Sequence, residues 1–177
     1  MATKQKSHKL TSPATLRASN CAQVDAQPGW YRWWMRKDKY DQLIAGPLAI
    51  TGMPETISID GDTYVAVYFG ISKDLKQRMR WHICQKHTAS QIKVGTISTF
   101  RRTLSALLRI PLSQSEQAVN DHLDNYMQVE WFYATNGKSP EQIETKELQD
   151  NLYPLNIDKN PNVDTSLLKA KRKEINC

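Results

Sequence analysis

The sequence from residue 64 to residue 82, YVAVYFGISKDLKQRMRWH, decides the fold of this chain. Its first part, from Tyr64 to Phe69, is rich in β-branched and aromatic residues and predicts a strand. Gly70 is expected to end that strand. After it, Ser72 or Asp74 can cap a helix by accepting a hydrogen bond from a free N–H of the first turn. The stretch therefore predicts a strand that leads directly into a helix.

The predicted helix carries one apolar face. Three residues that recur every four positions form an apolar stripe on it: Leu75, Met79 and Ile83. At about 100° per residue, Arg78 and His82 border this stripe, whereas Arg80 points away from it. A guanidinium and an imidazole one turn apart, at the edge of a buried face, suit a cleft that binds an anion. The alternative is that both side chains only cover the edge of the helix.

The composition is that of one globular domain with an excess of positive charge. The chain has 177 residues, of which 40% are hydrophobic, and a formal net charge of +6. This length suits a single domain with a real core. The excess of Lys and Arg suggests a polyanionic partner, because phosphate backbones attract clustered positive charge.

The cysteine pattern and the hydropathy indicate the cellular compartment. Cys21, Cys84 and Cys177 form no CxxC pair, which argues against a zinc site or a disulfide framework and indicates a reducing compartment. No apolar run approaches the length of a membrane span, and the N-terminus lacks the apolar core of a secretory signal. We therefore expect a cytoplasmic protein.

A second aromatic strand, PGWYRWW, is predicted upstream at residues 28–34. Its triplet GWY and the triplet YFG at 68–70 resemble the two motifs that give the GIY-YIG nuclease family its name. The sequence after YFG looks like the catalytic helix of that family, with Arg78 eight residues after Gly70.

Further pieces of the resemblance follow downstream. The stretch VEWF at 129–132 looks like the third strand of the family, and YPLN at 153–156 is similar to its closing Pro-x-x-Asn region. Glu144 precedes Asn156 by twelve residues, about the family's spacing. The resemblance covers roughly residues 28–161, which we expect to form the nuclease domain.

The resemblance implies an α/β fold in which a small antiparallel sheet, three-stranded or slightly larger, is flanked by helices. It also implies phosphodiester hydrolysis with a divalent ion, Mg²⁺ or Mn²⁺. One carboxylate, together with phosphate and water, is enough to hold such an ion. Glu144 is the candidate ligand, and Glu147, one turn later, is its rival.

The resemblance assigns roles to the other side chains of the site. Arg78 would hold the scissile phosphate with two parallel hydrogen bonds, which Lys cannot do as well. Tyr31 and Tyr68 would line the cleft, and Tyr68 would orient water or phosphate. Either His82 or Tyr31 would accept the proton of the attacking water; an imidazole pKa of about 6.5 suits neutral pH better than a phenol pKa of about 10. Asn156 would buttress the site or contact the phosphate.

One position departs from the family. Many members have Lys directly after the Gly of the second motif, and this chain has Ile71. Lys73 is the candidate to supply that positive charge and to contact DNA.

Four segments lie outside the minimal core of the family. Residues 1–27 predict a flexible polar segment or an arm resting on DNA, and residues 162–177 predict a basic tail. Insertions at about 36–61 and 85–128 are long enough to supply groups that read bases. In the first insertion, Asp-Gly at 60–61 predicts a tight hairpin turn and an extra strand.

The second insertion contains a predicted helix at 96–109. Arg101 and Arg102 lie off its apolar stripe. They belong either to a solvated face or to a surface that contacts phosphates or a groove, and we expect both to bind DNA.

The chain has no recognisable zinc finger or other appended DNA module. A compact domain with a long segment between the catalytic helix and the third strand resembles the restriction endonuclease branch, and so does the spacing of Arg78 and His82. We therefore expect a sequence-specific endonuclease acting on double-stranded DNA. Since one site cuts one strand, a double-strand cut requires a homodimer or two encounters. The alternatives are a structure-specific or nonspecific nuclease and a catalytically silent nucleic-acid-binding module.

Overall fold

The computed structural model describes residues 10–135, 137 and 139–175, and it is built around one antiparallel sheet. The strands lie in the order β2 (Thr56–Ile59), β3 (Asp62–Ser72), β1 (Gly29–Arg36), β4 (Met127–Tyr133). Each neighbouring pair is antiparallel. This sheet with its flanking helices confirms the predicted fold class.

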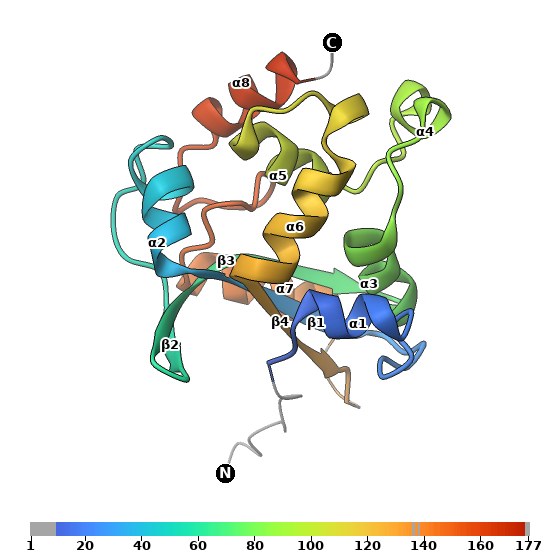
Figure 1. Cartoon of the computed structure of the whole chain (residues 1–177). Helices are drawn as coiled ribbons and strands as arrows, with labels where there is room; N and C mark the ends of the chain where they lie inside the picture. Colours follow the sequence, from blue (N-terminus) through green and yellow to red (C-terminus); the bar gives the residue numbers. More distant parts are fainter. Residues whose placement is uncertain (1–9, 136, 138, 176–177) are drawn as a thin grey trace.

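Helices cover both faces of the sheet. In chain order they are α1 (Pro13–Ala18), α2 (Lys37–Tyr40), η1 (Asp41–Ala45), α3 (Leu75–Cys84), α4 (Ala89–Val94), α5 (Thr99–Leu108), η2 (Leu112–Gln114), α6 (Glu116–Tyr126), α7 (Pro140–Asp150) and α8 (Ser166–Glu174). Figure 1 shows α5, α6 and α8 gathered over one face of the sheet. Within the described ranges, no helix is long and apolar enough to cross a lipid bilayer.

The sheet separates two apolar cores. The larger one joins Trp33 and Val67 of the sheet to Met79 of α3 and Phe100 of α5. The smaller one joins other sheet residues, among them Trp34 and Phe69, to Leu148 of α7. Helix α7 therefore covers the face of the sheet opposite α3 and α5. Side chains from α3 and from α7 can meet only at an edge of the sheet.

The predicted hairpin and extra strand are confirmed. Asp60 and Gly61 have φ angles of 49° and 89°, the positive values that a tight primed turn requires. They join β2 to β3. The prediction that Gly70 ends the strand is wrong, because β3 continues to Ser72. Gly70 is instead paired with Tyr31 of β1.

Helix α3 begins as its sequence predicts. Asp74 is the cap, with its carboxylate 2.9 Å from the backbone N–H of Gln77. The three residues of the apolar stripe are fully buried: Leu75, Met79 and Ile83. Arg80 points away, as expected, and its Nε donates to the carbonyl of Asn20. His82 lies deeper than a border position, since only 2% of it is exposed.

The predictions for the two chain ends need correction. Residues 10–27 are not a separate flexible segment, because Leu16 and Val24 are fully buried and Thr11 exchanges backbone hydrogen bonds with Val129. At the other end, α8 packs on α5 and buries Leu168, and Ile175 just after it is also buried. The predictions for residues 1–9 and 176–177 concern positions outside the described residues.

Candidate active site

A buried hydrogen bond joins strand β1 to helix α3. The hydroxyl of Tyr31, on β1, lies 2.8 Å from Nε2 of His82, on α3. On the other side of the imidazole, Nδ1 lies 2.8 Å from Oγ of Ser98, the cap of α5. Three elements distant in sequence thereby hold one imidazole in place.

The protonation states of Tyr31 and His82 follow from their burial. Burial raises the pKa of Tyr31 well above its usual value, and the neighbouring Tyr68 raises it further, so the Tyr31 hydroxyl keeps its proton. Burial and the positive charges of Arg78 and Arg101 hold the pKa of His82 well below its usual value, so the imidazole is neutral. In the tautomer that carries the ring proton on Nδ1, Tyr31 donates to Nε2 and Nδ1–H donates to Ser98, whereas the other tautomer reverses both directions.

Tyr68 and Arg78 complete this part of the site. The Tyr68 ring lies 6.2 Å from the Tyr31 ring and 5.1 Å from that of Phe100, between centroids. Burial raises the pKa of Tyr68, and Arg78 opposes that rise. The guanidinium carbon of Arg78 lies 5.4 Å from the ring centroid of Trp81, a cation–π distance. Arg78 is therefore a cation beside two phenols and one neutral imidazole.

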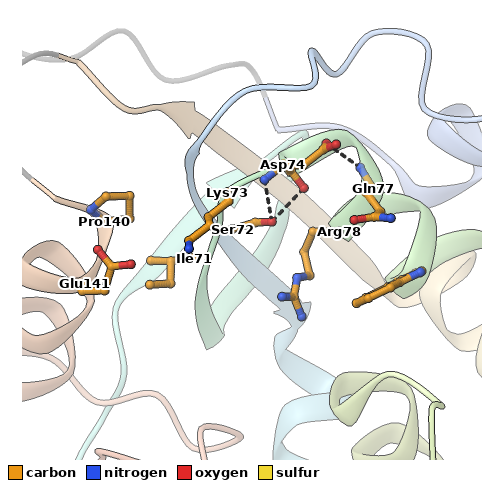
Figure 2. A pocket seen from close by; sticks show the side chains of 9 residues that line it. Ile71, Ser72, Lys73, Asp74, Gln77, Arg78, Pro140 and Glu141 are labelled. Carbon is orange, nitrogen blue, oxygen red and sulfur yellow. Dashed lines mark hydrogen bonds between the residues drawn. The ribbon is translucent and has the colours of Figure 1, made fainter.

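An open cleft of about 370 Å³ adjoins Arg78. Figure 2 shows Lys73 and Arg78 on one side of it, facing Pro140 and Glu141 from the start of α7. Ile71 lies between these two sides, so the Lys that many relatives carry there is replaced by an apolar side chain and Lys73 supplies a charge to the same cleft.

The two candidate metal ligands on α7 differ in their surroundings. In the described ranges Glu144 has one weak partner, with 3.3 Å between its carboxylate and Nζ of Lys159. Its negative charge contributes to the raised pKa of both Tyr31 and Tyr68. Glu147 accepts hydrogen bonds from the Tyr153 hydroxyl at 2.7 Å and from Asn151. The charge of Glu144 thus acts on both tyrosines, whereas Glu147 is hydrogen-bonded to residues that follow it at the end of α7.

The donor set fits a metal bound through one carboxylate. In the described part of the chain, no three His, Cys, Asp or Glu side chains are grouped so that they could hold an ion. A half-buried carboxylate oxygen with one long contact is a ligand that a hard divalent cation accepts, and phosphate and water can complete the shell.

Asn156 acts on the backbone next to Tyr68. Its Oδ1 accepts from the N–H of Phe69 at 2.9 Å, and its Nδ2 donates to the carbonyl of the same residue at 2.7 Å. Both ends of the amide are occupied and the residue is buried. Of the two roles open to Asn156, the geometry favours the buttress over a phosphate contact.

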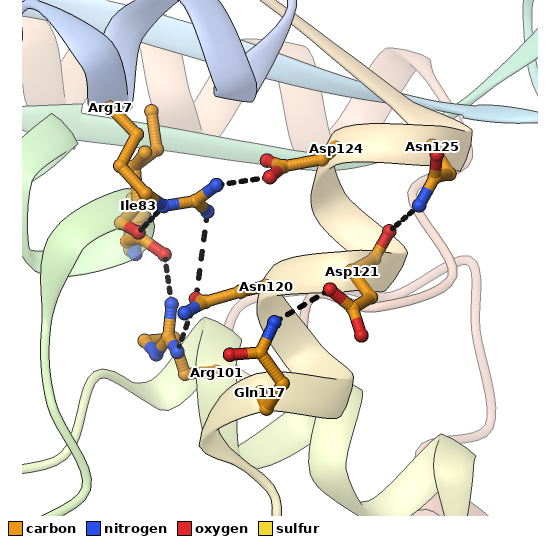
Figure 3. Close-up of polar contacts among 9 residues, drawn as sticks. Arg17, Ile83, Arg101, Gln117, Asn120, Asp121, Asp124 and Asn125 are labelled. Carbon is orange, nitrogen blue, oxygen red and sulfur yellow. Dashed lines mark hydrogen bonds and ion pairs between the residues drawn. The ribbon is translucent and has the colours of Figure 1, made fainter.

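Arg101 does not lie on a DNA-facing surface, and that prediction is corrected. Its side chain is fully buried. Figure 3 shows its guanidinium in a polar network with Asn120, which also contacts Arg17. Its other nitrogens donate to Nε2 of His87 at 2.9 Å and to the carbonyl of His82 at 3.0 Å. The guanidinium therefore stabilises the last turn of α3 through the carbonyl of His82. Arg101 is buried because α5 is packed on more sides than its apolar stripe indicates.

The structure adds two residues to the site that the sequence did not indicate. Ser98 precedes a helix, a position that predicts a cap but not a contact with His82. The sequence placed Arg172 in a basic tail, but it lies on the packed helix α8, and its charge opposes the rise in the Tyr68 pKa. The apolar residues Leu168 and Ile175, seven apart, were a signal for a packed helix.

Comparison with known families identifies the family of the domain. A family model described as GIY-YIG catalytic domain matches residues 29–176. The chain belongs to the GIY-YIG family. The matched region runs from the first motif strand through α8, beyond the boundary at 161 expected from sequence, and it supports endonuclease activity on DNA. No curated protein and no solved structure gave a significant match.

In this GIY-YIG domain, Gly70 is required by the ring of Tyr31. A Cβ at position 70 would lie 2.4 Å from both Cζ and the hydroxyl of Tyr31, so the ring would have to move. The resemblance gives Tyr31 a catalytic role, and displacing a catalytic group by an ångström lowers rates by up to about a hundredfold, so Gly70→Ala is expected to reduce cleavage on that order. Cleavage rates of folded protein at equal concentration provide the measurement.

Gly46→Ala is the matched control for that prediction. A Cβ at position 46 meets no atom within 4 Å, and the φ of −72° suits alanine. The control should cleave at the wild-type rate. Wild-type cleavage by Gly70→Ala would mean that the position of the Tyr31 ring does not matter for the reaction.

Proposed function

We propose that this protein is a divalent-metal-dependent endonuclease that cuts double-stranded DNA at specific sequences, as the restriction branch of the GIY-YIG family does. The observation that carries the proposal is the buried Tyr31–His82 hydrogen bond, set beside the cation Arg78 and the carboxylate Glu144. A protein that only bound DNA would have no use for a carboxylate close to the phosphate.

Arg78 binds the scissile phosphate in this proposal. Its guanidinium can offer two parallel N–H donors to the nonbridging oxygens, and it stabilises the charge that grows on them in the transition state. Stacking on Trp81 restricts the side chain before DNA arrives. Tyr68, whose strand is held by Asn156, orients the attacking water or the phosphate.

Glu144 would hold the divalent ion, Mg²⁺ or Mn²⁺. When bound, the ion supplies positive charge at the phosphate and stabilises the leaving oxygen. Glu144 also keeps Lys159 near the site through their ion pair, and this contact must loosen when the carboxylate takes a metal.

Tyr31 and His82 act as one base, so the two candidates do not exclude each other. The pKa of Tyr31 lies too far above neutrality for the phenol to take a proton unaided. Its hydroxyl can accept the proton of water while passing its own proton to the neutral Nε2 of His82. Ser98 then stabilises the resulting imidazolium by accepting the hydrogen bond from Nδ1–H.

The pH profile tests this base. A base works when deprotonated, so kcat/KM should fall as the pH drops through the pKa of His82 in the free enzyme. Because that pKa is lowered, the limb should lie below about pH 6.5 and a plateau should extend through neutrality. His82→Ala should remove the limb, and His122→Ala, which changes another buried histidine away from the site, should keep it. A rate that rises steadily toward about pH 10, unaltered in His82→Ala, would assign the base role to a tyrosine alone.

Base recognition is expected from the segments around the site. Lys73 is exposed in the cleft, Arg102 is half-buried on α5, and Lys93 is exposed on α4, which projects from one side of the molecule (Figure 1). Gln85 is a weaker candidate, since its amide is hydrogen-bonded to Thr96 and Ser98. Arg and Lys in such positions can reach guanine edges as well as phosphates.

Digestion of plasmid and phage DNA tests the proposal. Purified protein with Mg²⁺ or Mn²⁺ should produce discrete bands, and EDTA should abolish them. Linear double-strand products at low enzyme concentration would indicate a homodimer, whereas nicked circles that are cut later would indicate two encounters. A uniform smear on several DNAs at moderate salt would favour the nonspecific nuclease, and binding without cleavage under all these conditions would favour the silent module.

A further inference from the structure

Arg172, on α8, lies on the face of that helix that packs inward. Leu168 and Ile175 are buried, and Arg172 follows Leu168 by one turn, so the three share one face. Helix α8 packs on α5, and Phe100 of α5 contacts the Tyr68 ring. The guanidinium thus extends from α8 toward the side of the catalytic centre where Tyr68 lies.

The surroundings of Arg172 do not neutralise it. It is half-buried, and among the described residues no carboxylate or carbonyl forms a hydrogen bond or an ion pair with it. Burial lowers its pKa, and the like charge of Arg102 lowers it further, while Asp158 and Tyr68 act in the opposite direction. A half-buried guanidinium on the inward face of α8, without a carboxylate of the described residues bound to it, is a group that an anion would stabilise.

The charges of two arginines on different helices act on Tyr68. Arg78 lies on α3 and Arg172 on α8, and both charges lower the Tyr68 pKa that burial raises. Cations on two helices around one phenol suit a continuous anionic strand better than a single small anion.

We infer that Arg172 contacts a phosphate of the strand being cut, beside Tyr68 and across the site from Arg78. This inference rests on the proposed nuclease function and adds a catalytic arginine from the C-terminal helix. Half-burial limits the competing water around the guanidinium, so its hydrogen bonds to a phosphate gain in strength. The two arginines would then bind the backbone from both sides of Tyr68 and fix the register of the strand.

Arg172→Ala and Lys171→Ala provide the central comparison. Each removes one positive charge from adjacent half-buried positions of α8, but Lys171 lies at another cavity, with Arg109 and Glu174. Arg172→Ala should weaken duplex binding in EDTA by about tenfold or more and reduce the magnitude of the salt slope by about one. Lys171→Ala should have less than about a third of that effect on binding. Arg172→Lys should recover part of it, because it restores the charge without the planar fork.

A chemically altered DNA distinguishes a direct contact between Arg172 and a phosphate from an effect of the substitution on the protein structure. In duplexes that each carry one neutral methylphosphonate near the cut, the penalty of Arg172→Ala should disappear at one position, because that phosphate no longer offers a charge. Equal penalties at every position, or equal binding by Arg172→Ala and Lys171→Ala with matching melting temperatures, would overturn the inference. Wild-type protein that cuts no DNA with Mg²⁺ or Mn²⁺ would instead refute the proposed function, so the two failures are distinguishable.

Discussion

Glu144→Ala is expected to lower the rate of DNA cleavage by about a thousandfold or more, since a bound divalent ion stabilises the transition state by several kcal/mol. Among the described residues, the only partner of this carboxylate is Lys159, at 3.3 Å, so its loss should cost the fold little. DNA binding without metal should stay intact or become stronger, because an unneutralised carboxylate repels phosphate. Single-turnover cleavage and binding in EDTA are the two measurements.

Glu147→Ala is the control for this prediction. Glu147 lies one turn away on α7 and accepts hydrogen bonds from Tyr153 and Asn151, so its loss should lower the melting temperature more than the cleavage rate. The opposite pattern, with an active Glu144→Ala and a folded but inactive Glu147→Ala, would exchange the two roles.

Arg78→Ala is the second large effect. Removing a cation that stabilises charge in the transition state should lower turnover on the order of a hundredfold or more. Arg78→Lys should remain well below wild type, because a point charge does not reproduce two parallel hydrogen bonds. Since Arg78 also contributes to the lowered pKa of His82, the acid limb of kcat/KM should move toward higher pH in Arg78→Ala.

Arg80→Ala separates this effect from a general loss of charge. Arg80 is two residues away on α3, but it points outward and donates to the carbonyl of Asn20. Its loss should change mainly the salt dependence of binding. Equal losses of turnover in the two variants would mean that the direction of the side chains from α3 has no bearing on catalysis.

The sequence determined the local elements of this protein, since those depend on neighbours along the chain. The period of Leu75, Met79 and Ile83 fixed the buried face of α3, and Asp60-Gly61 fixed the hairpin because few residues tolerate positive φ angles. The motifs and their spacing were enough to predict the family.

Only the tertiary structure decided which polar groups meet. Tyr31 and His82 are 51 positions apart, and no local period encodes their hydrogen bond. For Arg101 and Arg172, the local sequence likewise did not predict the burial of the side chain. The position of Arg101 off the apolar stripe predicted an exposed side chain, but α5 is covered on several sides, by α6 and α8 among others. The run of positive charges around Arg172 predicted a solvated tail, but that segment is helix α8 and packs on α5. Burial depends on what packs against a helix from elsewhere in the chain, so Arg101 is in the core and Arg172 is half-buried on a packed helix.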